Sequence, residues 1–247
     1  MEPFIDRPSL NHDARPAGGK VDILLLHYTG MESADAALER MCDAGAKVSA
    51  HYMIDEDGTV TRMVDESMRA WHAGVSSWRG ASEVNGRSVG IELVNPGHEF
   101  GYRKFTEAQM AQLVPLCADV VLRHGIPTRN VLGHSDVAPD SKQDPGELFD
   151  WPALARAGIG LWPKTGFQPR RTGPVLDIGD QGAEVAALQG ALKSYGYGIE
   201  DDGAYGERTR LVVTAFQRHF RPLMVNGTAD PKTCGLIDHV ATLAASP

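Results

Sequence analysis

The chain has 247 residues, of which 42% are hydrophobic, 23% charged and 7% aromatic. This length and composition can bury a substantial core, which excludes a disordered protein and leaves one or two domains open. The formal charge of -8, from 32 acidic and 24 basic residues, repels polyanions and argues against nucleic acid as a partner. Cys42, Cys117 and Cys234 form no close Cys or His pairing, so neither a thiolate zinc site nor a redox motif is predicted.

The first twenty residues predict a coil, because they contain prolines and a pair of glycines and no apolar period. They also lack a basic segment followed by an apolar run, so no signal peptide is predicted. No uncharged apolar stretch in the chain approaches the roughly 18 residues of a membrane span. These features favour a cytoplasmic protein with no membrane span, and leave the cell envelope or periplasm as the alternative if another export route operates.

Strand and helix patterns then alternate. Residues 21–28, VDILLLHY, have the near-continuous apolar run of a strand covered on both faces. Ser33 can cap a helix that we expect to end at Gly45. Residues 49–64 read as two alternating strands joined by a turn at Asp57 and Gly58.

The next strand is expected at residues 87–94, RSVGIELV, and another at NVLGH after Pro127. Between them, Thr106 and Gln109 match a capping box, and apolar residues recur at helical spacing as far as Gly125. Strands that alternate with helices, one pair forming a hairpin, predict an α/β fold with a central mixed β-sheet flanked by helices.

The pattern changes after residues 162–174, where prolines, glycines and an arginine pair without apolar periodicity indicate a linker. Three helical stretches and no convincing strand follow, with Asp180 expected to cap the first helix and Thr209 to begin the second. We therefore predict a domain over residues 1–165 with a coil over 1–20, a linker over 166–176, and a small three-helix C-terminal domain over 177–247.

Three possible metal ligands fall at predicted strand ends or in loops: His27, His134 and Asp144. Two neutral imidazoles and one carboxylate suit zinc and leave a fourth position for water, whose pKa the ion would bring towards about 7. A single histidine at a strand end is also common as a hydrogen-bonded structural residue. Pro139 and Pro145 favour the metal hypothesis, because they hold the loop around Asp144 extended.

Glu92 is the single carboxylate in its predicted strand. A period of two places it on one face with Gly90 and Val94, opposite three apolar side chains, so partial desolvation should raise its pKa and suit it to act as a base. A nearby cation would oppose that rise. A glutamate in a salt bridge within the sheet is the alternative interpretation.

Five motifs, in order, carry a family resemblance: LLLHYTG, SAHYMIDEDGTV, AWHAG, SVGIELVN and GHSDVAPDSKQDPG. Through them, residues 21–155 resemble the zinc-dependent N-acetylmuramoyl-L-alanine amidases of the AmpD and AmiD type, which are related to peptidoglycan recognition proteins and phage lysozyme-like amidases. The resemblance implies one zinc ion per chain on His27, His134 and Asp144, with Glu92 as general base and Lys142 stabilising the oxyanion. The implied reaction is hydrolysis of the amide between the lactyl group of N-acetylmuramic acid and L-alanine of the stem peptide.

The same resemblance places the AWHAG loop beside the cleft and suggests His72, Ala73 and Asn95 as substrate contacts. Trp71 is equally consistent with a core position. His51 and Tyr52 are assigned to packing and hydrogen bonding within their strand, and the remaining histidines to surface or capping roles: His12, His98, His124, His219 and His239.

Residues 177–247 resemble the three-helix peptidoglycan-binding domain that often accompanies wall hydrolases, although Cys234 stands where tryptophan is common. A domain that only packs on the amidase and shapes its cleft is the alternative. Peptidoglycan or a muropeptide is thus the expected partner, and a non-catalytic recognition module is the competing function. The sequence leaves open whether the substrate is polymeric murein or a small anhydro-muropeptide, and which oligomer forms.

Overall fold

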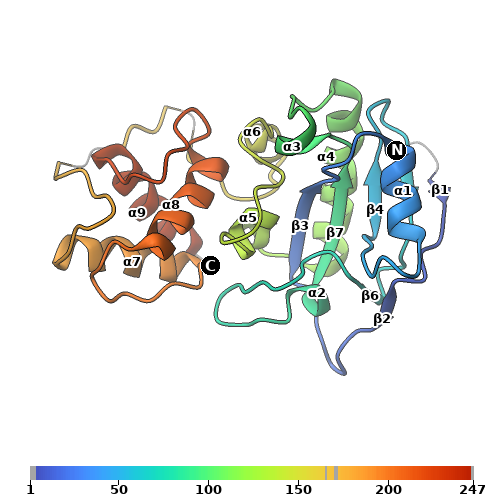
Figure 1. Ribbon diagram of the computed structural model, residues 1–247, viewed down its shortest axis with the longest axis horizontal. Coiled ribbons are helices and arrows are strands. Elements are labelled where there is room, and N and C mark those ends of the chain that lie inside the picture. Colours follow the sequence, from blue (N-terminus) through green and yellow to red (C-terminus); the bar gives the residue numbers. More distant parts are fainter. Residues whose placement is uncertain (1–3, 165, 170–171, 246–247) are drawn as a thin grey trace.

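The computed structural model describes residues 4–164, 166–169 and 172–245. Figure 1 shows two parts side by side, one built around a β-sheet and one made of the last three helices. The main sheet has the order β1-β5-β4-β7-β3-β8, in which β4 and β5 are antiparallel and the other neighbours are parallel. The predicted central mixed sheet is confirmed. Its strands are β1 (Ile5–Asp6), β5 (Val60–Arg62), β4 (Tyr52–Ile54), β7 (Ser88–Leu93), β3 (Ile23–Tyr28) and β8 (Val131–Gly133).

The coil predicted for the first twenty residues is wrong in part, because two short strands lie within it. β1 adds to the edge of the main sheet, and β2 (His12–Ala14) pairs with β6 (Met68–Ala70) in a separate antiparallel ribbon. Both strands are largely exposed, so they carry no alternation of apolar and polar residues that a sequence could reveal. They form because β5 and β6, which are distant in the sequence, offer unpaired backbone groups.

The helices of the first part are α1 (Ala34–Cys42), α2 (Val84–Arg87), α3 (Gly97–Phe100), α4 (Glu107–His124), α5 (His134–Val137) and α6 (Trp151–Arg156), with a 3-10 turn η1 (Thr128–Asn130). The Ser33 cap of α1, the Thr106 capping box of α4 and the end of α4 at Gly125 are confirmed, and Gly125 lies in the left-handed region. The predicted end of α1 at Gly45 is wrong. The chain leaves the helix at Asp43, whose carboxylate accepts a hydrogen bond from the Gly45 amide and forms a local turn.

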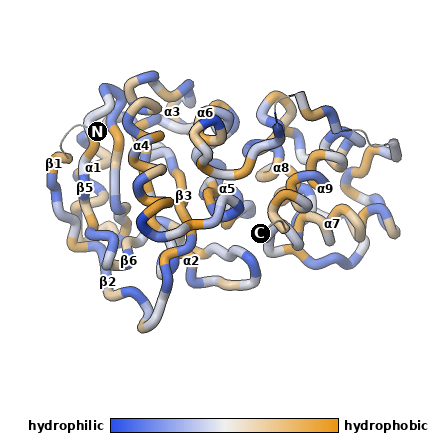
Figure 2. Tube along the Cα trace, turned by 180° about the vertical axis from the view of Figure 1, so that it is seen from behind, coloured by the Kyte–Doolittle hydropathy of each residue, from blue (hydrophilic) through white to orange (hydrophobic). Residues whose placement is uncertain are grey.

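The two faces of the sheet have different partners. Ile91 and Leu93 of β7 pack in the same apolar cluster as the inward side of α4, whereas Val94 packs with α1. Figure 2, which looks from behind, shows α4 lying over the sheet beside the hydrophobic strand β3. Glu92 alternates with Ile91 and Leu93, so it lies on the α1 side. One face therefore serves the core alone, while the other leaves room for polar groups.

The C-terminal part consists of α7 (Ala183–Tyr195), α8 (Glu207–Phe220) and α9 (Pro231–Ala245), as the three helical patterns predict. Two details of the prediction are wrong. The cap of α7 is Gly182, because the Asp180 carboxylate instead accepts from the Asp177 amide, and α8 begins at Glu207, two residues before Thr209.

The two parts share one apolar core. Trp78 of the first part makes edge-on ring contacts with Tyr195 and Tyr197, at centroid separations of 5.1 and 5.4 Å. Of the predicted linker, residues 170–171 lie outside the described residues, and Leu176 already bridges to Ala229 of the C-terminal part. Among the described residues, no helix is long and apolar enough to cross a membrane.

Candidate metal centre and active site

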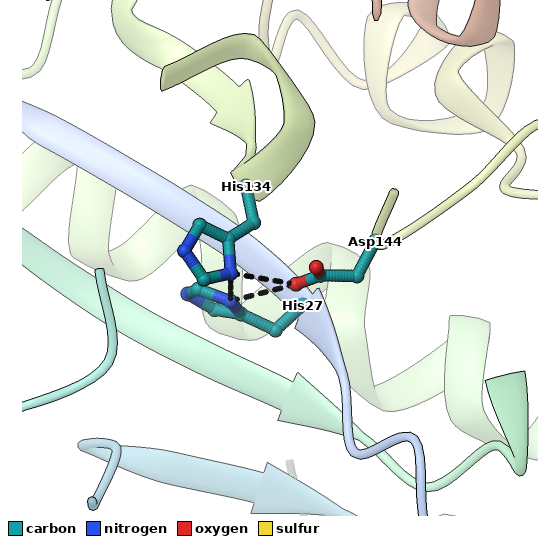
Figure 3. A group of neighbouring side chains, drawn as sticks. All are labelled: His27, His134 and Asp144. Atoms are coloured by element: carbon teal, nitrogen blue, oxygen red, sulfur yellow. Dashed lines mark hydrogen bonds and ion pairs between the residues drawn. The ribbon is translucent and has the colours of Figure 1, made fainter. Parts of the chain in front are cut away.

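Neighbouring parallel strands bring the two histidines together. Leu26 of β3 is in register with Gly133 of β8, so the residues that follow, His27 and His134, emerge at the same edge of the sheet. The Nδ1 atoms of these two rings are 3.0 Å apart, and Asp144 Oδ2 lies 2.9 Å from His27 Nδ1 and 3.0 Å from His134 Nδ1. Figure 3 shows the three side chains converging from β3, the start of α5 and the following loop.

A backbone hydrogen bond returns the Asp144 loop to the sheet edge. The Ser135 amide donates to the Asp144 carbonyl at 2.9 Å, which places the carboxylate against both imidazoles. Burial acts to raise the pKa of Asp144, but His134 and His27 outweigh it and hold that pKa below its usual value. Burial, followed by the proximity of His134, lowers the pKa of His27 to about 4. The carboxylate is therefore ionised and His27 neutral at pH 7, as metal ligation requires.

The outer nitrogen of each ring has its own partner. His134 Nε2 lies 3.2 Å from the Ala73 carbonyl oxygen, and His27 Nε2 lies 3.0 Å from His72 Nδ1. A carbonyl only accepts, so Nε2 of His134 carries a proton, and in the neutral form of the ring Nδ1 presents a lone pair. An imidazole lone pair and an ionised carboxylate oxygen 3.0 Å apart are what a cation-binding site offers, and the three buried residues fit a metal ion.

Glu92 stands beside this group. It is in register with His27 on the adjacent strand, so the two side chains lie on one face of the sheet. The residue is 9% exposed, and its Oε2 atom has no hydrogen-bond partner in the part of the chain that the structure describes. Burial, reinforced by the charge of Asp144, raises the pKa of Glu92 well above its usual value, while Lys142 acts to lower it. The salt bridge considered as an alternative is not among the ion pairs of the described residues.

A cavity of about 530 Å³ opens next to Glu92. Its walls come from the turn after β3, from α1 and from the end of α3, and they are mostly apolar with a few polar groups, as is usual for a ligand site. The lining residues are Thr29, Gly30, Met31, Glu32, Ala36, Ala37, Arg40, Met41, Val48, Glu92 and Phe100.

Lys142 is exposed on the same loop as Asp144, two residues before it. Its charge acts on both Glu92 and His27, lowering the pKa of each. The structure thus brings together five of the residues predicted for the site: His27, Glu92, His134, Lys142 and Asp144.

The three residues suggested as substrate contacts are all buried. His72 and Ala73 lie behind His27 and His134, facing the outer nitrogens of these two rings. The Asn95 side chain is engaged in its own turn, where it donates to the Arg103 carbonyl at 2.7 Å and accepts from the Gly97 amide at 3.1 Å. Substrate contact by these residues stays a prediction. His51 has the expected structural role, since its Nδ1 accepts from the Gly90 amide at 2.9 Å.

Sequence reasoning missed a buried group at the domain boundary. Asp136, in α5, accepts from the Gly133 amide at 2.8 Å, from Tyr197 Oη at 2.6 Å and from His219 Nδ1 at 2.7 Å. The surface or capping role expected for His219 is wrong, because its ring is 2% exposed and stacks on Trp151. Helical spacing from Val212 and Phe216 could have placed His219 on the inward face of α8.

A mixed β-sheet flanked by helices, whose edge carries a His-His-Asp group that could hold a metal ion, a buried glutamate and an adjacent cavity, has the features of a hydrolase site. Residues 17–147 match the N-acetylmuramoyl-L-alanine amidase family, and residues 181–237 match a peptidoglycan binding domain family. The chain belongs to the N-acetylmuramoyl-L-alanine amidase family and is an amide hydrolase.

Individual relatives agree. The N-acetylmuramoyl-L-alanine amidase AmiD of Escherichia coli K12 is 37% identical over 235 residues, covering 89% of this chain and 82% of that protein. The 1,6-anhydro-N-acetylmuramyl-L-alanine amidase AmpD of Salmonella typhimurium SL1344 is 34% identical over 171 residues, covering 62% of this chain and 89% of that protein. The second relative therefore matches a much smaller share of this chain than the first.

Solved structures show the same likeness. AmiD from E. coli, in complex with the substrate anhydro-N-acetylmuramic acid-L-Ala-D-gamma-Glu-L-Lys, superposes with a TM-score of 0.77 at 34% identity, covering 93% of this chain and 91% of that one. AmpDh3 from Pseudomonas aeruginosa gives a TM-score of 0.76 at 31% identity, covering 89% and 91%. The second of these has also been determined with an anhydromuramic pentapeptide. Both likenesses extend over the sheet and the C-terminal helices.

Proposed function

We propose that the chain hydrolyses the amide bond between the lactyl group of N-acetylmuramic acid and L-alanine of a stem peptide, in cell-wall turnover or recycling. One observation carries the proposal: the unpaired, buried Glu92 carboxylate lines a cavity and adjoins the His27, His134 and Asp144 group. An enzyme needs such a carboxylate as a base, whereas a module that only recognises peptidoglycan has no use for a buried charge without a partner.

His27 Nδ1, His134 Nδ1 and Asp144 Oδ2 would hold one zinc ion per chain. When bound, zinc polarises the scissile carbonyl and lowers the pKa of water at its open position. Nitrogen and oxygen donors without thiolates, three in number, suit this role better than a closed structural site.

Glu92 takes the proton from the attacking water and delivers it to the leaving amine of L-alanine. Its raised pKa brings it closer to the range in which a carboxylate can both accept and return a proton. Lys142 places its ammonium where negative charge develops on the carbonyl oxygen. A donor of this kind contributes about 2 to 4 kcal/mol to lowering the barrier.

The preferred substrate in this proposal is a small anhydro-muropeptide, the class that the AmiD and AmpDh3 structures hold. The match of residues 181–237 to a peptidoglycan binding domain favours a second candidate, polymeric murein. Comparing the rates at which the purified protein releases peptide from intact sacculi and from soluble anhydro-muropeptides distinguishes them.

The test of the reaction uses anhydro-N-acetylmuramyl-L-Ala-D-γ-Glu-L-Lys. We expect about one zinc per chain and release of a peptide with a free L-alanine amine, which a chelator abolishes and added zinc restores. Glu92→Ala should keep its zinc and lose turnover. Absence of both zinc and cleavage in the wild-type protein would refute the proposal, and turnover that survives in Glu92→Ala would refute the assignment of the base alone.

The domain division proposed here is a catalytic domain over residues 1–165, a linker over 166–176 and a peptidoglycan-binding-like domain over 177–247. The two family matches, over residues 17–147 and 181–237, fall on either side of this linker. The cytoplasmic location also remains a proposal, and cell fractionation with an antibody against the chain tests it against the envelope.

A further inference from the structure

His72 forms the middle of a buried chain of hydrogen bonds that starts at a ligand histidine. Its Nδ1 lies 3.0 Å from His27 Nε2, and the two rings meet edge to face at 83°. On the other side, His72 Nε2 lies 3.3 Å from Ser88 Oγ, and that hydroxyl donates to the Val84 carbonyl at 2.7 Å. The polar contacts of the His72 ring among the described residues are these two.

The last of these hydrogen bonds determines which atom donates in each of the others. The Val84 carbonyl can only accept, so the Ser88 hydrogen points to it and Ser88 Oγ accepts from the other side. His72 must then carry its proton on Nε2, and in the neutral ring Nδ1 is left as an acceptor. His27 therefore donates from Nε2 and presents its Nδ1 lone pair towards Asp144 and His134.

Ala73, the residue after His72, orients the second histidine of the proposed site, His134. The Ala73 carbonyl accepts from His134 Nε2 at 3.2 Å. Both backbone amides, of His72 and of Ala73, donate to one oxygen, Asn85 Oδ1, at 3.0 and 2.7 Å. Asn85 and Val84 both belong to α2, so this short helix anchors the loop and terminates the hydrogen-bond chain.

The sheet makes room for the His72 ring. A Cβ atom added to Gly90 of β7 would lie 2.6 Å from three atoms of that ring, closer than real Cβ contacts come. Gly90 precedes Glu92 by two residues on the same face of the strand. A glycine at this place lets the imidazole sit directly behind His27.

We propose that His72 is a positioning residue which, with the Ala73 carbonyl, holds the two ligand histidines in the tautomer and orientation that metal binding needs. This inference rests on the proposed metal site and assigns His72 a role behind that site, away from the substrate. Groups that orient histidine ligands in this way typically change metal affinity by roughly 10- to 100-fold when they are removed.

The test measures zinc affinity by competition with a chromophoric chelator, in the full chain. His72→Phe keeps a ring but removes the acceptor, and we expect it to weaken zinc binding roughly 10- to 100-fold. His72→Asn places an amide oxygen near the position of Nδ1 and should recover most of the affinity. His124→Asn removes a partly buried histidine of α4 that pairs with Glu66 and contacts neither His72 nor the two histidines of the site, and it should leave zinc affinity unchanged.

Two further measurements separate positioning from simple damage to the fold. In the zinc-loaded wild type, nitrogen-15 spectra should show His72 protonated at Nε2. As a single substitution, Gly90→Ala should weaken zinc binding, because the added Cβ displaces the His72 ring. Added to His72→Ala, where that ring is absent, it should have little further effect.

The proposal is overturned if His72→Phe binds zinc like the wild type, or if His72 is protonated at Nδ1. Failure of the wild-type protein to bind zinc would instead refute the metal site itself, so the two failures are distinguishable. Thermal unfolding of the chelator-treated variants identifies any variant that does not fold. If His72→Phe does not fold, the zinc affinity of His72→Asn is compared with that of the wild type instead.

Discussion

Two buried polar regions draw residues from the segment Gly133 to Asp144, and the carboxylates in them, Glu92 and Asp136, are hydrogen-bonded in opposite ways. At the proposed metal centre, ring nitrogens of His27 and His134 face a carboxylate oxygen of Asp144, and one Glu92 oxygen has no hydrogen-bond partner among the described residues. At the domain boundary, both Asp136 oxygens receive donors, one from Tyr197 and the other from His219 and the Gly133 amide.

The difference indicates what each region is for. A buried polar group that is fully hydrogen-bonded stabilises one arrangement of the chain, whereas one left short of partners costs stability and persists where a ligand or a reaction completes it. The same short segment supplies His134 to the first region and Asp136 to the second. The C-terminal helices therefore help to hold the part of the chain that carries His134, one of the proposed metal ligands.

The largest expected effect concerns Glu92, the carboxylate with an oxygen that lacks a hydrogen-bond partner among the described residues. Glu92→Gln should lower kcat by roughly 10²- to 10⁴-fold, because it removes the general base. It should also raise the melting temperature of the chelator-treated protein at neutral pH. Burial raises the pKa of Glu92 in the folded state, so the fold loses stability as pH rises through that pKa, and glutamine removes this loss.

Activity assays and thermal unfolding at several pH values check both effects. The exposed Glu99→Gln, on α3, serves as the control and should change neither. A lower melting temperature for Glu92→Gln would mean that the carboxylate is a structural group, and the contrast between the two regions would fail.

Asp136 is the carboxylate whose two oxygens are hydrogen-bonded. Asp136→Ala should destabilise the protein by about 3 to 5 kcal/mol, because it leaves three buried donors without their acceptor. Denaturant unfolding followed by tryptophan fluorescence measures it. Asp140→Asn is the matched control: it lies in the same loop and pairs with Arg208 across the boundary, but this pair is exposed and should contribute at most about 1 kcal/mol. Equal effects of the two variants would remove the distinction between buried and exposed boundary contacts.

Lys142→Met should lower kcat/KM by roughly 10²- to 10³-fold, because the ammonium stabilises charge that develops during the reaction. Zinc content and melting temperature should stay unchanged, because the side chain is exposed. Steady-state kinetics with the anhydro-muropeptide measures it. Lys104→Met, which removes another exposed ammonium, is the control. A rise in KM at constant kcat would show that Lys142 binds the substrate instead.

The smallest effect concerns Glu66, a second carboxylate with hydrogen-bond donors on both oxygens, which lies away from the site. Burial acts to raise the pKa of Glu66, but Arg123, His124 and Tyr52 outweigh it and lower that pKa to about 2. The stabilisation is present above the ordinary glutamate range and is lost as pH falls towards 2. Glu66→Gln should therefore destabilise the protein by about 1 kcal/mol at pH 7, a figure reduced because Arg123 is 42% exposed, and by less at pH 3.

Urea unfolding at both pH values, together with zinc affinity, tests this prediction. Zinc affinity should not change. A loss of stability that is the same at pH 3 and pH 7 would mean that packing, and not the charge of Glu66, stabilises this cluster.

Local features of the sequence predicted much of the fold. The apolar run of β3, the hairpin at Gly58, the Ser33 cap and the capping box at Thr106 each depend on a few adjacent residues, so they could be recognised without the rest of the molecule. The short strands β1 and β2 could not, because each pairs with a strand that is distant in the sequence.

For the site, the sequence by itself determined the donor types: two imidazoles and a carboxylate at strand ends and in a loop, with one glutamate alternating among apolar residues. Tertiary structure alone decided how they meet. Strand register sets Glu92 beside His27, the Gly90 gap admits His72 behind it, and docking of α8 brings His219 to Asp136. These contacts join residues up to 83 positions apart, so no local period encodes them, and only the packed fold fixes their distances and protonation.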